Sequence, residues 1–268
     1  QAISWGNGLI YNPVDFFNPF DPAAVDKEYK SGDDMLYGQY LHDSGNDFEF
    51  VAVWRRDENG NTGNDVNTQT LKYHAFIGEG ELDLLAARHY DDDIVSVGGL
   101  NNLGGAIVRG DALLTHTELD TYASAVINLS YSWVGFDKNI SGVLEYFFNG
   151  MGVNESQYQQ LEQHPDLTKR LQRGELFTLG RHYLAGGLNI EMTPLFMFTP
   201  NMFFNLGDSS GLVQLVGNYD LAQNWQILLA GNLPFGGKGT EFGGLDTPID
   251  GLQFSTGPSL FAQIAFYF

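Results

Sequence analysis

The sequence predicts an all-β fold: an antiparallel transmembrane β-barrel of about fourteen strands, or the C-terminal part of a slightly larger one. Two observations predict it. Apolar and polar residues alternate with a period of two along many segments, most of them near the length that a tilted membrane-crossing strand needs. Short and long connections also tend to alternate between these segments, which is typical of a barrel with tight turns on one side of a membrane and longer loops on the other.

The composition permits this fold and argues against several functions. Glycine occurs 33 times in 268 residues and aromatic residues reach 14%, which suits many strands joined by turns. Cysteine is absent, so no disulfide, zinc–thiolate site or cysteine nucleophile is available. A formal net charge of −20 with only 13 Lys and Arg argues against nucleic-acid binding. No stretch approaches 18 consecutive apolar residues, so no membrane-spanning helix is expected. An all-β barrel of this size is ordinary, and we expect residues 1–268 to form a single outer-membrane barrel domain to which further N-terminal strands could belong.

The N-terminal stretch "NPVDFFNPFDP" (residues 12–22) has the character of a stiff, non-helical loop. Each of its prolines fixes φ and pushes the preceding residue toward an extended shape. We predict that the loop folds into the lumen as a constriction; the alternative is that it packs on the outer rim. The residues that would set its charge and anchor it are Asp15, Asp21, Phe16, Phe17 and Phe20.

Strands follow along the rest of the chain. Alternation is clear in "TYASAVINLSYSW" (121–133), "RHYLAGGLNIEM" (181–192) and "NWQILLAGNL" (224–233), and also in "DFEFVAVW" and "TLKYHAFI". The chain ends on "SLFAQIAFYF" (259–268), in which the residues from Leu260 to Phe268 at every second position form an apolar face. Aromatic residues concentrate near strand ends, as interfacial girdles do: Trp54, Trp133, Phe204, Tyr219, Trp225, Phe266 and Phe268.

One segment departs from the β pattern. "NESQYQQLEQHPDLTKRLQRGEL" (154–176) is rich in helix-forming residues and places leucines at roughly helical spacing around Pro165. We predict a short helix or helix pair on an external loop, folded over the mouth. The alternative is a polar surface helix with no role in transport.

Charged and polar side chains fall on the face of the strands opposite the apolar one. A solid soluble core would not accept such charges unpaired, so a membrane barrel is favoured over a soluble β-sandwich. We predict that they line a water-filled lumen; the alternative is that they pair across it and brace a plugged barrel. The predicted pore-lining residues are Lys72, His74, Arg109, Asp111, Glu145, Asn189 and Glu191.

Two acidic clusters beside histidines, "HYDDDI" (89–94) and "HTELD" (116–120), are the candidates for metal binding or catalysis. The first lacks the alternating ligand spacing of a calcium loop. Neither G-x-S-x-G nor H-E-x-x-H occurs in the chain. We therefore predict no catalytic residue, no metal site and no cofactor, and a barrel hydrolase is only the third choice of function.

The ending "AFYF", aromatic-x-aromatic at the C-terminus, resembles the assembly signal of Gram-negative outer-membrane β-barrel proteins. The stretches "AISWGNGLIYNPVDFFNPFDP" and "GKGTEFGG" are similar to segments of uncharacterised barrels related to alginate-export and porin-like families. The resemblance implies location in the cell outer membrane of a Gram-negative bacterium. It also implies contact with outer-membrane lipid and lipopolysaccharide, and with the barrel-assembly machinery through the last strand. In such relatives "SWGNG" (4–8) is an internal strand, and the chain here opens on Gln1, so we expect a mature form or a fragment.

These features together predict a passive outer-membrane channel, porin-like or exporter-like, for small solutes or a secreted acidic polymer. The alternative is a structural or surface-binding barrel with a plugged lumen. Much of the acidic excess lies in residues 12–34, 55–69, 89–93 and 241–250, which we assign to the outer mouth. Acidic groups at a pore mouth raise the local cation concentration, so a modest cation preference at low salt is expected.

Overall fold

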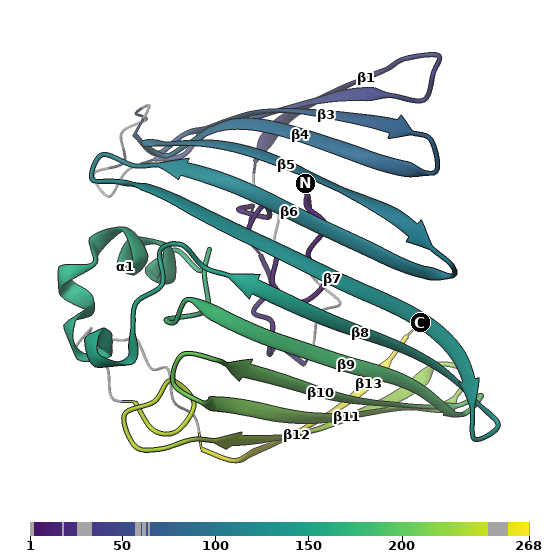
Figure 1. Ribbon diagram of the computed structural model, residues 1–268. Helices are drawn as coiled ribbons and strands as arrows, with labels where there is room; N and C mark the ends of the chain where they lie inside the picture. The colour runs from purple at the N-terminus through teal and green to yellow at the C-terminus, as the bar shows by residue number, and fades with distance from the viewer. Residues whose placement is uncertain are drawn as a thin grey trace.

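The structure, a computed structural model, describes residues 3–17, 19–25, 34–56, 60, 63, 65–245 and 257–267. In this part of the chain thirteen strands form one antiparallel sheet, and each strand pairs with its neighbours in the sequence (Figure 1). The prediction of an all-β antiparallel fold is confirmed. The strands are β1 (Met35–Leu41), β2 (Asp47–Val53), β3 (Thr68–Ile77), β4 (Gly80–His89), β5 (Asp92–Leu103), β6 (Ala106–His116), β7 (Thr121–Gly135), β8 (Lys138–Phe148), β9 (His182–Thr193), β10 (Phe196–Asn205), β11 (Ser210–Ala222), β12 (Trp225–Phe235) and β13 (Ser259–Phe266).

The two ends of the sheet differ in their connections, as the sequence predicted. At one end every connection between described strands is short, and at the other end three long loops emerge (Figure 1). The long loops are residues 54–67, 149–181 and 236–258. At the short-turn end, Phe136 and Asp137 both have positive φ, 52° and 56°. This is the backbone of a primed two-residue turn, whose twist matches that of the flanking strands.

The longest loop carries two helical pieces, a 3₁₀ helix η1 (Glu155–Gln163) and the α-helix α1 (Pro165–Gln172). Pro165 stands at the first helical position, where its missing N–H costs no hydrogen bond. The predicted helix pair is thus confirmed. Its leucines are buried in a cluster at the long-loop end of the sheet, together with Met151, Val153, Tyr158, Leu179 and Leu245. Neither helix in the described ranges is long and apolar enough to cross a membrane.

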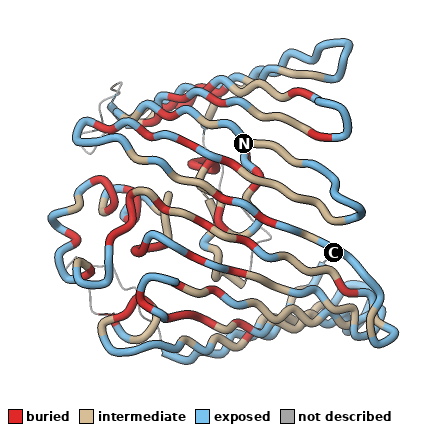
Figure 2. Tube along the Cα trace, in the orientation of Figure 1, coloured by how far each residue is buried: buried red, intermediate tan, exposed pale blue. Residues whose placement is uncertain are grey.

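The two faces of the sheet differ sharply in exposure. Leu144 on β8 is 54% exposed, whereas the next residue, Glu145, is fully buried on the opposite face. The same alternation runs along the other strands, where buried and exposed positions succeed one another (Figure 2). Apolar side chains thus face outward from strand after strand, among them Leu71, Leu84, Val97, Ile127, Leu215, Leu229 and Ile264.

The sheet curves around a chain segment that is not a strand (Figure 1). This N-terminal segment comprises the described residues 3–17 and 19–25, none of which is in a strand. The expectation that "SWGNG" (4–8) forms an internal strand is therefore wrong. Its backbone groups bind wall side chains instead of a strand ladder. Phe268, the last residue of the proposed assembly signal, lies outside the described residues.

Within the described residues β1 and β13 are the two outer strands of the sheet and are not paired with each other. Closure of the ring by further strands or by these two edges stays a prediction.

Candidate functional site

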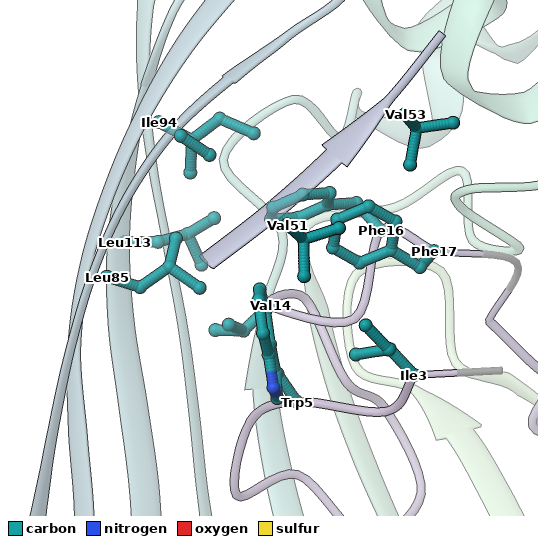
Figure 3. Packing of buried hydrophobic residues seen from close by; sticks show 11 residues of the cluster. Ile3, Trp5, Val14, Phe16, Phe17, Val51, Val53, Leu85, Ile94 and Leu113 are labelled. Atoms are coloured by element: carbon teal, nitrogen blue, oxygen red, sulfur yellow. The ribbon is translucent and has the colours of Figure 1, made fainter. Parts of the chain in front are cut away.

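Aromatic side chains anchor the N-terminal segment to one side of the concave face. Phe16, Phe17 and Trp5 are buried, and the rings of Trp5 and Phe17 meet edge to face at 5.6 Å. They pack on apolar residues of β2, β4, β5 and β6 (Figure 3). The wall residues of this cluster are Val51, Val53, Leu85, Ala87, Ile94 and Leu113. Burying a side chain of this size stabilises by about 1.5–3 kcal/mol, so the cluster holds the segment firmly against the wall.

Glu145 of β8 holds the next part of the segment. Its carboxylate accepts hydrogen bonds from the backbone N–H groups of Leu9 (2.7 Å), Ile10 (3.1 Å) and Tyr11, and from Asn128 Nδ2 (3.1 Å). Successive backbone N–H groups that converge in this way form an anion-binding concavity. Charge-assisted hydrogen bonds are stronger than neutral ones, so the buried carboxylate is well satisfied here.

Asp111 of β6 makes a second polar attachment. It accepts hydrogen bonds from the backbone N–H of Asn7 and from Asn7 Nδ2 (2.8 Å), and it is only 5% exposed. Asn128 of β7 donates in turn to the backbone carbonyl of Asn7 (2.8 Å). The backbone polar groups of the segment are thereby paired with wall side chains, as burial requires.

A cation stands between two carboxylates on the neighbouring strands. Lys72 Nζ lies 3.3 Å from Glu49 and 3.2 Å from Asp83, and the Asp83 carboxylate also pairs with His74 Nδ1 at 3.0 Å. Trp5 Nε1 donates to Glu49 (3.2 Å), so this network also touches the segment. These side chains are mostly buried, and the single lysine is shared between the two carboxylates.

On the other side of the interior a cavity of about 460 Å³ separates the segment from β8 to β12. Sites for small molecules usually have volumes of about 300–1,000 Å³. The cavity is lined by neutral polar side chains and by apolar ones, with Leu9 and Ile10 of the segment forming its inner side. Its polar lining consists of Asn189, Thr199, Asn201, Gln214, Asn218 and Gln226.

The predicted pore-lining residues therefore fall into separate groups. Lys72, His74, Asp111 and Glu145 lie on the side that the N-terminal segment occupies, and Asn189 lines the cavity. The remaining two lie elsewhere. Arg109 donates to Ser130 (2.8 Å), and Glu191, toward the short-turn end, accepts from Asn139 (2.8 Å).

The predicted constriction residues lie within the N-terminal segment inside the sheet. Phe16 and Phe17 belong to its buried cluster, and Asp15 is buried and accepts from Ser4 Oγ (2.6 Å). Phe20 lines a smaller cavity of about 150 Å³ beside the segment. Asp21 accepts from the backbone N–H of Ala23 in an exposed turn. A constricting effect on transport stays a prediction.

Sequence reasoning missed most of the residues that line the larger cavity. Gln214, Val216 and Asn218 follow one another at every second position and therefore lie on one face of β11. Asn201 and Gln226 face the same cavity from β10 and β12. The period of two was visible in the sequence. The predicted pore lining consisted mainly of charged residues and therefore omitted these amides, although a neutral amide offers both a hydrogen-bond donor and an acceptor.

A carboxylate fixes the third long loop over the interior. Glu241 is buried and accepts hydrogen bonds from Leu179 N–H (2.8 Å), Tyr183 Oη and Asn205 Nδ2 (2.6 Å). Burial raises the pKa of the Glu241 carboxyl, and nearby Asp208 adds to the rise, so that it reaches about 7 although the three hydrogen bonds oppose it. The loop is thus attached to β9, to β10 and to the loop that carries the helices.

His89, the first residue of the motif "HYDDDI", makes two buried side-chain contacts. His89 is buried between Thr68 Oγ1 (2.8 Å) and Glu175 (2.9 Å), and Thr68 is fully buried, out of reach of a solute. Burial alone raises the pKa of Glu175, but the hydrogen bond from His89 and the charges of Arg170 and Arg173 hold it below its usual value.

The acidic run beside His89 contacts arginines. Asp92 pairs with Arg170 of α1 at 2.7 Å, and Arg88 lies 3.9 Å from Asp91 and 3.8 Å from Asp93. Among the described residues no three His, Asp or Glu side chains converge to hold a metal ion.

The fold defines a class of protein in which a curved antiparallel sheet with an apolar outer face surrounds an interior that contains buried charged side chains, amide side chains and an aromatic cluster. No family model matches the sequence, and no curated protein matches it. A solved structure described as the NanC porin in a rhombohedral crystal form is similar, with 13% identity and a TM-score of 0.34, over 87% of this chain and 99% of that one. At that identity and TM-score we take nothing about function from it.

Proposed function

We propose that this chain forms an outer-membrane channel for passive diffusion of small solutes, narrowed on one side by its own N-terminal segment. The observation that carries the proposal is the contrast between the two faces of the sheet, as between the outward Leu144 and the inward Glu145. The proposal includes contact with lipid and lipopolysaccharide, assembly by the barrel-assembly machinery of a Gram-negative cell, and no enzymatic activity.

The outer face supports a membrane location. Soluble monomers rarely expose contiguous apolar patches larger than a few hundred Å². Here exposed leucine, isoleucine, valine and methionine side chains recur on the strands from β3 to β13. In a bilayer these side chains are in contact with hydrocarbon, and the strand ladder satisfies the backbone groups.

The inner face supports passage of solutes. The cavity beside β8 to β12 is lined by polar groups, which can replace the hydration of a passing molecule. Its volume of about 460 Å³ suits small molecules more than a polymer.

Single-channel recording in a planar lipid bilayer tests the proposal. The purified chain should produce stepwise conductance, and blocking the cavity by Asn201→Trp should reduce it. The matched control Leu215→Trp adds the same ring on the outward face of β11, where it should leave conductance unchanged. Absence of conductance steps at every voltage, for correctly folded protein, would overturn the channel.

The tight hold on the N-terminal segment favours a second candidate, a structural or surface-binding barrel with a plugged lumen. Glu145 and Asp111 fix the segment, and the aromatic cluster packs it against the wall. A plugged barrel would conduct only after the segment is loosened, for example in Glu145→Ala. A channel would conduct before and after that change, so the same recording separates the two.

A further inference from the structure

Charge is segregated inside the sheet. Lys72, Asp111 and Glu145, on β3, β6 and β8, contact the N-terminal segment or another charged side chain. The cavity beside β8 to β12 has no charged group among its described lining residues. We propose that this cavity selects neutral, hydroxyl-rich solutes of about saccharide size over ions of either sign. The inference rests on the proposed channel function and names its substrate class.

The polar lining is a network of amide and hydroxyl groups. Asn201 donates to Gln214 (3.3 Å), Gln214 donates to Asn232 (3.0 Å), and Thr199 donates to Asn189 (2.9 Å). Each of these side chains can both donate and accept a hydrogen bond. A hydroxyl group has the same dual capacity, so a polyol can exchange hydrogen bonds with this wall without leaving an unpaired group.

One polar atom of the wall has no partner. Asn218 Oδ1 is shielded from solvent and has no hydrogen-bond partner among the described residues. A buried acceptor in this state costs free energy until a donor reaches it. Asn218 lines the cavity, so a rotation of its amide toward the cavity would let a solute O–H supply that donor.

Apolar side chains also line the cavity. Leu9 and Ile10 of the N-terminal segment contribute to one side, and Phe203 and Val216 stand among the amides of β10 and β11. Saccharides carry C–H surfaces as well as hydroxyl rims, and the cavity offers both apolar and polar groups to contact them.

No charged side chain is among the described residues that line the cavity. Glu145 is fully buried under the hydrogen bonds of the segment. The carboxylates of Asp220 and Glu191 lie toward the short-turn end, where they accept from Gln226 (3.1 Å) and Asn139 (2.8 Å). A charged solute would lose hydration in the cavity without a compensating ion pair, which is costly. Neutral solutes lose less and should pass faster.

Liposome swelling with solutes of matched size tests the inference. Glucose should enter liposomes that contain the protein about tenfold faster than glucuronate or glucosamine, a ratio equivalent to roughly 1.4 kcal/mol. Equal rates for the three solutes, or faster entry of either charged sugar, would overturn the neutral preference while leaving the channel intact. No swelling with any of them, together with no conductance, would overturn the proposed channel itself.

A charge added to the wall provides the second arm. Asn201→Asp should slow glucuronate, speed glucosamine and leave glucose nearly unchanged. The control Asn102→Asp adds the same charge near the short turn at Gly105, where the residue accepts that glycine's N–H, and should change none of the rates. If both variants have the same effect, the selectivity does not arise at this cavity.

Discussion

The Glu145 carboxylate on β8 accepts the backbone N–H of Tyr11, a residue 134 positions away in the chain. The same two stretches meet a second time through their rings, because Tyr11 stacks on Phe147 with centroids 5.1 Å apart. A wall strand thus supplies both an acceptor and an aromatic surface to the N-terminal segment. The position of the segment, and with it the width of the remaining cavity, depends on this contact.

Replacing Glu145 by glutamine should loosen the N-terminal segment. The amide retains one acceptor oxygen but turns an NH₂ group toward backbone donors, so at least one buried N–H loses its partner. We expect a loss of roughly 2–3 kcal/mol in the free energy of unfolding and a larger single-channel conductance. Urea unfolding in detergent and bilayer recording measure the two effects.

Glu191→Gln is the matched control, since Glu191 is only partly buried and contacts Asn139. It should change stability by less than about 0.5 kcal/mol. Unchanged conductance in Glu145→Gln, despite lower stability, would mean that the segment does not limit the path.

The strands were predictable from the sequence because their pattern is local. The alternation in residues 121–133 lies within β7, and the segment 154–176, rich in helix-forming residues, contains η1 and α1. The N-terminal segment was not predictable in the same way. The two glycines and the asparagine of "SWGNG" disfavour a strand, but no local pattern reveals its distant partners Asp111 and Asn128. The amide-lined cavity likewise depends on the register between β9 and β12, which no short pattern reveals.

Tryptophan quenching should separate the outer face from the interior. Trp133 and Trp225 are 38% and 44% exposed on the outward face, and Trp5 is 5% exposed inside the sheet. In variants that each retain one of these tryptophans, brominated phospholipids should quench Trp133 and Trp225 strongly and Trp5 weakly, because collisional quenching requires contact with lipid. Strong quenching of Trp5, or none of the other two, would contradict the membrane orientation.

Stability should fall as the pH rises between about 4.5 and 7, because of Glu241. Its folded-state pKa of about 7 lies above the ordinary value of 4.5, chiefly through burial. In this window the unfolded chain releases the proton while the folded chain retains it, so the contribution is complete below pH 4.5 and is lost by about pH 7. The full change is roughly 3–4 kcal/mol, at about 1.4 kcal/mol per pKa unit.

Urea unfolding in detergent at several pH values measures this slope. Glu241→Gln should flatten it, and Glu118→Gln, an exposed control at the same end, should leave it unchanged. A slope that persists in Glu241→Gln would assign the titration to another group.

Ion preference should arise at the mouth, because the cavity wall is neutral. Asp91 and Asp93 lie at the long-loop end with exposed carboxylates, and Arg88 at almost 4 Å balances them only in part. We therefore expect a modest cation preference at low salt that fades near 1 M, where the Debye length falls to about 3 Å. Asp91→Asn combined with Asp93→Asn should lower it, while Asp92 is kept because it holds Arg170 of α1. Reversal potentials in a KCl gradient measure the preference, and an anion preference at low salt would show that these carboxylates do not border the path.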